Sequence, residues 1–188
     1  MKKKVSVIVG SLRNKSVARK IAKNILKMFP ENYDVNIVEI RDLPLYDCDY
    51  DDPNETEKVL PAIYTSFRNE IKSSDAVFFV TAENNRLVPA SIKNAIDICS
   101  KPNNDVAFKG KPVGIVSHSI GKLGGFSANK SLQLALSYFN PQYVGQPEAF
   151  IGNSHSLFDG DSEEINNEGT KAFLQDYVNR FVELVNKQ

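Results

Sequence analysis

Short apolar runs alternate along the chain with longer segments whose apolar residues recur every three to four positions. The short runs predict buried strands, and the wider spacing predicts helices that bury one face. The clearest helical stripe consists of Val17, Ile21, Ile25 and Phe29. Strands are predicted near residues 5–9, 35–38, 76–80, 112–116 and, from a weaker pattern, 143–149. Helices are predicted near residues 17–29, 61–72, 91–98, 129–139 and 166–185.

This regular alternation predicts an α/β fold, a doubly wound five-stranded parallel sheet with helices on both faces. Parallel strands need crossover helices, and right-handed crossovers cover both sides of the sheet. Residues 76–80 are apolar throughout, which is typical of a strand buried on both faces. No linker or internal repeat interrupts the pattern, so we expect residues 1–188 to form one domain. In such sheets, ligands bind beyond the carboxyl ends of the strands.

The polar turn after the first predicted strand has the composition of an anion site. Residues 10–16 read Gly-Ser-Leu-Arg-Asn-Lys-Ser. The first N–H groups of the helix that follows have no helical partner, and the helix dipole favours negative charge there. Ser11 and Ser16 add hydroxyls, and Arg13 adds a cation suited to phosphate. The turn contains neither a nucleoside-triphosphate loop nor a dinucleotide fingerprint, which favours a terminal monophosphate. From the turn alone, a second interpretation stays open, in which Ser16 only caps the helix.

Two more polar loops follow the third and fourth predicted strands. Residues 81–89 carry asparagine amides, which together with backbone groups suit a heteroaromatic ring with carbonyls and N–H groups. Residues 117–125 carry two serines and three glycines, which let the backbone approach a flat ligand. Taken singly, neither loop is decisive, because each is also compatible with an ordinary connection between a strand and a helix. If the sheet has the flavodoxin-like strand order, strands one, three and four end side by side and all three loops converge.

Charge and composition exclude several classes of partner. The chain has 23 basic and 23 acidic residues and a formal net charge of +0, which gives no general attraction to nucleic acid or anionic lipid. No apolar stretch approaches the roughly 20 residues that span a bilayer. Cys48 and Cys99 form no Cys-x-x-Cys motif, and no cysteine cluster lies near His118 or His155. We therefore expect a cytoplasmic protein without a metal site and without a nucleic-acid or membrane partner.

Several of these segments together resemble one known family. The turn at residues 10–16 looks like a Gly-Ser-x-Arg-x-x-Ser phosphate loop, and residues 93–97, Lys-Asn-Ala-Ile-Asp, match the most specific signature of that family. Residues 110–113 and the glycine-rich residues 119–125 match as well. The family comprises the NAD(P)H-dependent FMN reductases of flavodoxin-like fold, which include chromate, quinone and azo-dye reductases. The resemblance covers residues 5–149.

The resemblance implies FMN-binding roles for three groups of residues. The phosphate would be held by the side chains of Ser11, Arg13 and Ser16 and by the backbone N–H groups of Asn14 and Val17. The family's Pro-Glu-Tyr-Asn segment, which lies along the isoalloxazine ring, falls on Ala82, Glu83, Asn84 and Asn85. The other edge of the flavin would be lined by Ser117, Ser119 and Gly121. The chain departs from the family pattern where alanine replaces the proline and asparagine replaces the tyrosine, so the usual aromatic wall is missing.

The resemblance also implies an activity. NAD(P)H would reduce the flavin by hydride transfer and leave, and a quinone, azo compound, flavin or metal oxyanion would then take the electrons in a ping-pong sequence. The flavin supplies the chemistry, so no catalytic side chain or metal is assigned. Members of the family commonly form homodimers or homotetramers. Two alternatives remain: a flavodoxin-type FMN electron carrier without pyridine-nucleotide turnover, and a non-enzymatic module that binds another phosphorylated ligand.

Overall fold

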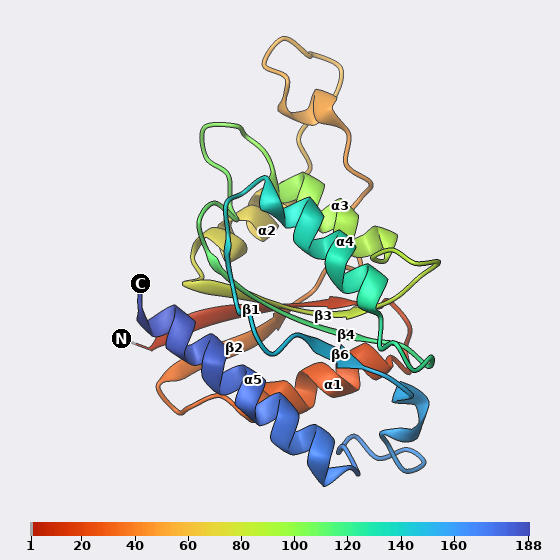
Figure 1. Cartoon of the computed structure of the whole chain (residues 1–188). Helices are drawn as coiled ribbons and strands as arrows, with labels where there is room; N and C mark the ends of the chain where they lie inside the picture. The colour runs from red at the N-terminus through yellow and green to blue at the C-terminus, as the bar shows by residue number, and fades with distance from the viewer. Residues whose placement is uncertain (1) are drawn as a thin grey trace.

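The computed structural model describes residues 2–188, and a parallel β-sheet organises them (Figure 1). The strands are β1 (Lys3–Gly10), β2 (Tyr33–Val38), β3 (Ala76–Ala82), β4 (Pro112–His118), β5 (Gln142–Tyr143) and β6 (Ala149–Ile151). Their order is β2-β1-β3-β4-β5, with β6 also paired to β4, and every pairing is parallel. The predicted doubly wound, flavodoxin-like fold is therefore confirmed.

The fifth strand differs from the prediction. Instead of one strand over residues 143–149, two short strands share the edge of β4: β5 pairs with its beginning and β6 with its end. The intervening residues include Gly145 and Pro147. Proline has no N–H to donate to a ladder and glycine weakens a strand, so the chain leaves the sheet between the two pieces.

The helices cover both faces of the sheet. They are α1 (Val17–Leu26), α2 (Ala62–Lys72), α3 (Ala90–Cys99), α4 (Phe126–Ser137) and α5 (Glu168–Asn186), with short 3₁₀ turns η1 (Cys48–Asp51) and η2 (Ser154–Ser156). α1 and α5 pack on one face, and α2, α3 and α4 pack on the other (Figure 1). Each face has its own apolar core, and β3 and β4 contribute side chains to both.

Local chemistry sets the helix ends. α1 begins after Ser16, whose hydroxyl accepts from the Arg19 backbone N–H at 3.1 Å. It ends at Leu26, earlier than the predicted Phe29, and Pro30 follows shortly after. α4 begins three residues before the predicted start, immediately after Gly125.

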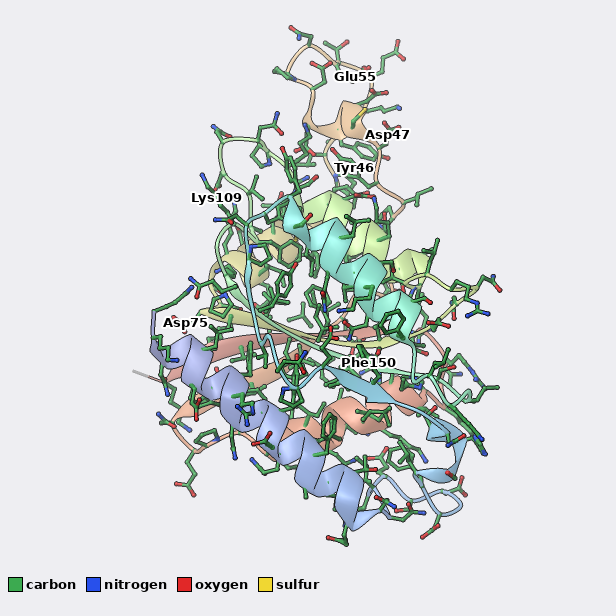
Figure 2. The ribbon with its side chains drawn as sticks, viewed as in Figure 1. Tyr46, Asp47, Glu55, Asp75, Lys109 and Phe150 are labelled. Carbon is green, nitrogen blue, oxygen red and sulfur yellow. The ribbon has the colours of Figure 1, made fainter. Side chains whose placement is uncertain are left out.

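The segment between β2 and α2 projects from the body of the molecule (Figure 1). Tyr46 lies near its base, Asp47 further out and Glu55 near its tip (Figure 2). Asn94 of α3 holds the base, since its carbonyl accepts from the Tyr46 N–H at 2.7 Å and its amide donates to the Pro44 carbonyl at 2.9 Å. The segment is therefore anchored to the same helix that follows the second polar loop.

A second anchor for this segment is a buried ion pair. Arg68 of α2 is only 3% exposed and donates two hydrogen bonds to the Asp51 carboxylate, at 2.8 and 2.6 Å. Its Nε also donates to the Ile98 carbonyl at 2.7 Å. The guanidinium thus ties η1 to α2 and α3 at once.

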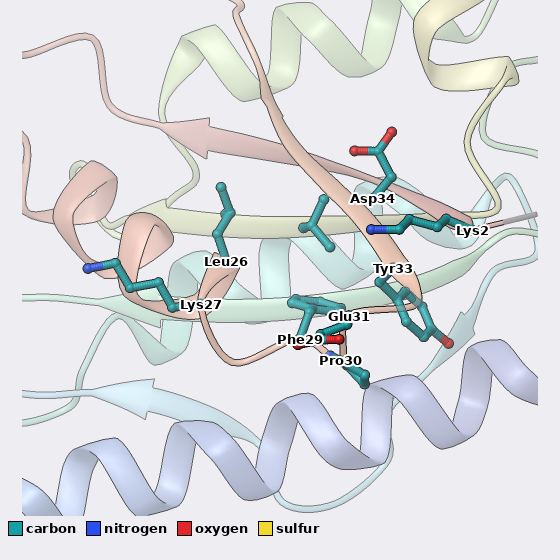
Figure 3. Close-up of a pocket in the computed structure, with 9 residues that line it drawn as sticks. Lys2, Leu26, Lys27, Phe29, Pro30, Glu31, Tyr33 and Asp34 are labelled. Carbon is teal, nitrogen blue, oxygen red and sulfur yellow. The ribbon is translucent and has the colours of Figure 1, made fainter.

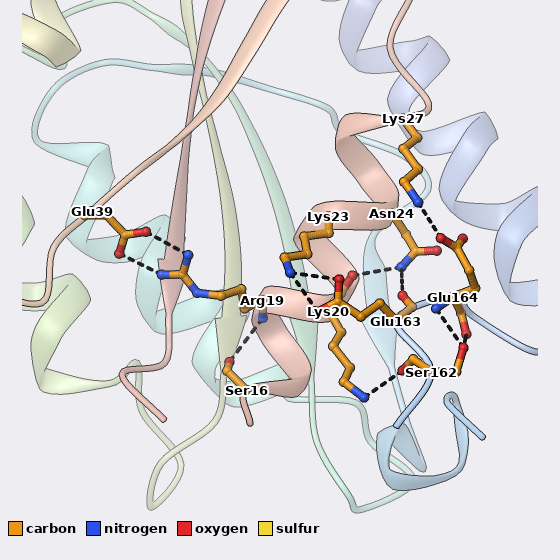
Figure 4. A network of polar contacts seen from close by, with 10 residues as sticks. All are labelled: Ser16, Arg19, Lys20, Lys23, Asn24, Lys27, Glu39, Ser162, Glu163 and Glu164. Atoms are coloured by element: carbon orange, nitrogen blue, oxygen red, sulfur yellow. Dashed lines mark hydrogen bonds and ion pairs between the residues drawn. The ribbon is translucent and has the colours of Figure 1, made fainter. Parts of the chain in front are cut away.

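The loop before α5 is fastened along α1 (Figure 4). Lys23 and Lys27 pair with Glu163 and Glu164 on the exposed side. Beneath them, buried Asn24 donates to the Glu163 carbonyl at 2.6 Å and accepts from the Ile165 N–H at 3.2 Å. Exposed ion pairs contribute little each, so the buried amide is the stronger link.

Candidate functional site

A cleft of about 670 Å³ lies at the carboxyl edge of the sheet. Its walls come from the loops after β1, β3 and β4 and from Ser154 in η2. The strand register explains the convergence, because Gly10 pairs with Thr81 and Ala82 pairs with His118. The three polar loops singled out in the sequence therefore meet in one cavity, whose volume lies within the roughly 300–1,000 Å³ of small-molecule sites.

Gly10 ends β1 where the cleft begins, and a larger residue there would displace its neighbours. A Cβ at this position would lie 2.5 Å from Cδ1 of Ile92 and 2.8 Å from Oγ1 of Thr81. The glycine thus lets β1 pass close to α3 and β3 just before the chain turns into the first loop.

The first loop presents donors without protein partners. The backbone N–H groups of Asn14 and Val17 reach no acceptor within the part of the chain that the structure describes. Arg13 is exposed and lines the cleft. Arg41 supports the loop from behind by donating to the Leu12 carbonyl at 2.6 Å. Free amides at a helix N-terminus beside a guanidinium form an anion site.

The second loop is a tight turn at the rim of the cleft. Asn84 and Leu87 exchange two backbone hydrogen bonds of 3.0 Å, and Asn85 and Arg86 between them have φ of 49° and 72°. Two consecutive positive φ values are typical of a type I′ turn, which asparagine tolerates well. Before the turn, Glu83 accepts from the Ala128 backbone N–H at 3.1 Å and so caps the first turn of α4.

The third loop is held by its own hydrogen bonds and by β6. Ser117 is fully buried and donates to the Gly124 carbonyl at 2.9 Å. The Ser119 hydroxyl accepts from the Gly121 N–H at 3.2 Å, and the Ser119 N–H donates to the Ile151 carbonyl at 3.1 Å. The fold of this loop is therefore fixed before any ligand binds.

The sequence assigned site roles to neither His118 nor Ser154, yet both line the cleft. His118 is 8% exposed, and its Nδ1 lies 3.0 Å from Oγ of Ser154. Its Nε2 is buried and has no hydrogen-bond partner among residues 2–188. The alternation of a strand does not reveal this inward-facing imidazole, because every residue of β4 is buried.

The structure divides the twelve sequence-predicted residues into two groups. Those that line the cleft are Ser11, Arg13, Val17, Ala82, Glu83, Asn84 and Ser119. Those that do not are Asn14, Ser16, Asn85, Ser117 and Gly121. Asn14 and Ser16 line a separate hollow of about 220 Å³, next to Asp161 and Glu163. The cleft therefore collects members of all three predicted loops, while several neighbours shape the loops from behind.

Comparison with known proteins assigns the chain to a family. The NADPH-dependent FMN reductase family matches residues 3–156. This chain belongs to that family. A quinone reductase from Pseudomonas putida is 44% identical over 181 residues, covering 96% of this chain and 94% of the relative. A quinone reductase from Escherichia coli strain K12 is 32% identical over 188 residues, covering 99% and 97%. The solved structure of FerB, a flavoenzyme NAD(P)H:(acceptor) oxidoreductase from Paracoccus denitrificans, has a TM-score of 0.86 and 33% identity and covers 98% of both chains.

Family membership confirms the resemblance noted in the sequence and makes the chain an oxidoreductase that uses FMN and NAD(P)H. The cleft of this FMN reductase fits that cofactor. Unpaired backbone N–H donors at the start of α1 and the guanidinium of Arg13 suit a phosphate. None of the helices within residues 2–188 has the length and apolar character to cross a membrane.

A second hollow, of about 640 Å³, lies at the amino ends of β1 and β2 (Figure 3). Lys2 and Lys27 stand at its opposite ends, and Phe29 and Tyr33 line it with rings 5.8 Å apart. It is far from the three loops, since parallel strands end at the other edge of the sheet. This hollow carries no group of converging donors comparable to the first loop.

A lysine forms ion pairs with the acidic residues on either side of Cys48. The ammonium of Lys58 pairs with Asp47 at 2.5 Å and with Asp49 at 2.7 Å. Three potential ligand atoms, from Asp47, Cys48 and Asp49, lie close together there. Because an internal cation already balances the carboxylates, the group forms part of an exposed salt-bridge network.

Burial of His118 couples folding of this FMN reductase to pH. Desolvation lowers the pKa of His118 to about 4, against 6.5 for a free imidazole. Between these values the unfolded chain binds a proton that the native chain does not. The free energy of unfolding should therefore rise with pH from 4 to 6.5 and fall on acidification, by up to about 3 kcal/mol.

Urea unfolding at pH 4.5 and pH 7.5 measures this linkage. His118→Gln should flatten the pH dependence, whereas His155→Gln, at an exposed position, should leave it unchanged. If the free energy of unfolding changed equally with pH in the wild type and in His118→Gln, His118 would not be the source of the pH dependence.

Proposed function

We propose that this FMN reductase is a quinone reductase that works by a ping-pong sequence, with NAD(P)H and the acceptor using the same cleft in turn. The observation that carries the proposal is the convergence of the three loops in one open cleft at the carboxyl edge of the sheet. The relatives named quinone reductase, at 44% and 32% identity over nearly the full chain, support the substrate class. Azo compounds, free flavins and metal oxyanions are further acceptors that a broad cleft would admit.

Bound FMN would supply the hydride and electron chemistry. The protein would bind and orient the cofactor and its substrates, and it would exclude water from the cleft. Arg13, the Ser11 hydroxyl and the free amides at the start of α1 would hold the phosphate. Ser16 would act from behind, because its hydroxyl is already engaged in capping α1.

The second and third loops would position the rest of the cofactor. Glu83 is bonded to the α4 backbone, so it would keep the second loop against the first turn of α4 rather than contact the reacting atoms. Ala82, Asn84 and Ser119 line the cleft and would contact the flavin directly. Asn85 would shape the turn, and Ser117 and Gly121 would shape the third loop. With no aromatic side chain at position 84, one face of the ring would stay open to substrates.

Assembly and location complete the proposal. We propose that residues 1–188 act as one FMN-binding domain in the cytoplasm and that copies of it associate. Leu134 of α4 and Tyr138, the C-cap residue of that helix, are 76% and 77% exposed and lie four residues apart, on the same side. Large apolar side chains exposed together are typical of contact surfaces.

Turnover and absorbance test the function together. The purified protein, reconstituted with FMN, should show flavin absorbance and oxidise NADH or NADPH when benzoquinone is present. Flavin binding without pyridine-nucleotide oxidation would instead indicate an electron carrier. A protein that stays colourless after reconstitution and binds no FMN in a calorimetric titration would overturn the proposal.

Arg13→Ala should weaken FMN binding by roughly 10- to 100-fold, because a charge-assisted hydrogen bond to phosphate is lost. Riboflavin, which lacks the phosphate, should bind the variant and the wild type equally. Flavin fluorescence quenching measures both dissociation constants. Lys15→Ala removes the same charge from the same loop but from outside the cleft, so it should change neither value much. An unchanged FMN affinity in Arg13→Ala would remove Arg13 from the site.

A further inference from the structure

The first loop, at residues 11–16, is tied to the rest of the chain at very few points. Within residues 2–188, a single hydrogen bond reaches residues 12–15 from outside the loop: Nη2 of Arg41 donates to the Leu12 carbonyl at 2.6 Å. The loop also has an ion pair of 3.8 Å between Lys15 and Asp161, whose side chains are 88% and 100% exposed. Such exposed pairs contribute little. The position of the loop backbone therefore depends chiefly on Arg41.

The backbone on both sides of Arg41 is anchored. Arg41 follows β2, and its neighbours Ile40 and Leu43 are buried in the apolar core under α2, α3 and α4. Glu39, two residues before Arg41, accepts two hydrogen bonds of 2.7 Å from the guanidinium of Arg19 (Figure 4). This pair fixes the end of β2 against α1, the helix into which the first loop leads. Arg41 therefore holds the loop from a fixed point.

The bond from Arg41 sets the direction of a whole peptide unit. The Leu12 carbonyl and the Arg13 N–H belong to one planar trans peptide, so the two groups point in opposite directions. With the carbonyl turned toward Arg41, the N–H is turned away from it. This N–H has no acceptor within residues 2–188. Leu12 and Arg13 line the cleft, whereas Arg41 does not. A hydrogen bond to the carbonyl also polarises the peptide and strengthens its N–H as a donor.

We propose that Arg41 is a positioning residue for the phosphate site and acts through the Leu12–Arg13 peptide. The inference rests on the proposed function, in which the FMN phosphate occupies the first loop. Arg41 touches neither cofactor nor substrate. By holding the Leu12 carbonyl, it keeps the Arg13 N–H and the free amides that follow directed at the phosphate. Because Arg41 lies where the projecting segment leaves β2, the base of that segment contributes to cofactor binding.

Flavin titrations test the role of Arg41. Arg41→Met keeps the aliphatic stem without the donor and should weaken FMN binding roughly 3- to 10-fold. Riboflavin, which has no phosphate, should bind that variant and the wild type equally. The FMN loss should persist in roughly 0.5 M salt, because salt screens attraction through solvent but not a direct bond to a carbonyl. Lys15→Met is the matched control: it removes a cation from the loop itself and should change FMN affinity less than about twofold.

Backbone ¹⁵N relaxation of the flavin-free protein tests the tether without any ligand. In the wild type, the amides of residues 12–14 should have order parameters near the value of about 0.85 that marks rigid backbone. In Arg41→Met, they should fall toward the value of roughly 0.6 that marks flexible backbone. The amides of the second loop, which Arg41 does not contact, serve as an internal reference. Thermal unfolding should show no loss of global stability, because Arg41 is exposed.

The outcomes separate this inference from the function on which it rests. If the wild type binds neither flavin, the proposed function fails, while the relaxation experiment still shows whether Arg41 orders the loop. If the wild type binds FMN and Arg41→Met binds it equally tightly, Arg41 does not position the site. An equal loss for both flavins, a loss that disappears in salt, or a loss without any change in loop order would give Arg41 a different role and overturn the inference.

Discussion

Asp51→Asn is expected to lower the free energy of unfolding by about 3–5 kcal/mol. Asp51 and Arg68 form a pair whose side chains are almost fully buried, and the guanidinium donates one hydrogen bond to each oxygen of the Asp51 carboxylate. Removing the negative charge leaves Arg68 as an uncompensated buried cation, which costs far more than the pair itself contributes. For a chain of this length the melting temperature should fall by about 6–20 °C.

Urea and thermal unfolding measure the effect, and Asp49→Asn is the matched control. Asp49 lies two residues away in the same projecting segment, but its pair with Lys58 is exposed. The control should therefore cost about 1 kcal/mol or less. Replacing both buried partners, as in Asp51→Leu with Arg68→Met, should restore much of the lost stability. Equal losses in Asp51→Asn and Asp49→Asn would show that the buried pair has no special role.

The fold could be predicted from the sequence because its signals are local. β3 is apolar at nearly every position, and α1 carries an apolar residue at every fourth position. Strand and helix are therefore distinguished without tertiary information. The edge strand could not be predicted correctly. β5 and β6 are two and three residues long, and their pairing with β4 is a long-range contact that no local pattern encodes. The exit of the chain around Pro147 is readable only once that pairing is known.

The cleft could be predicted only in part. The loops were located because strand ends in a parallel sheet share an edge, but the direction of each side chain depends on turn geometry and packing. Asn85 sits at the tip of a type I′ turn with φ of 49°, and Ser117 turns into the protein to bond Gly124. Ser154 reaches the cleft from a segment more than thirty residues beyond β4, and no spacing in the sequence indicates its contact with His118.

The most specific sequence signature proves to be a structural element. In the run at residues 93–97, Asn94 fixes the base of the projecting segment, and Lys93 and Asp97 form an exposed pair at i, i+4. None of these three side chains lines the cleft. The signature therefore identifies the family through a helix that supports the second loop, rather than through contact with the ligand.

Gly124→Ala should destabilise the third loop and lower the free energy of unfolding by about 2–5 kcal/mol. Gly124 has φ of +61°, where a side chain costs about 1–2 kcal/mol. A Cβ there would also lie 2.5 Å from the Phe150 carbonyl carbon and 2.6 Å from the Ile151 nitrogen. These are backbone atoms of β6 and cannot rotate away, so strand and loop must separate, which adds roughly 1–3 kcal/mol.

Alanine substitutions at two other glycines distinguish the stability cost of the backbone conformation from the cost of crowding. Gly121 lies in the same loop without a positive φ, and a Cβ there would meet only Oγ of Ser119 at 3.7 Å, so Gly121→Ala should be nearly neutral. Gly110 has φ of +70° and open space around it, so Gly110→Ala should show the conformational cost alone, about 1–2 kcal/mol. Chemical denaturation ranks the three variants. Because β6 leads into η2, the separation forced by Gly124→Ala should also displace Ser154 and weaken FMN binding, whereas Gly110→Ala should leave the dissociation constant unchanged. A Gly124→Ala variant no less stable than Gly110→Ala would mean that β6 does not hold the third loop in place.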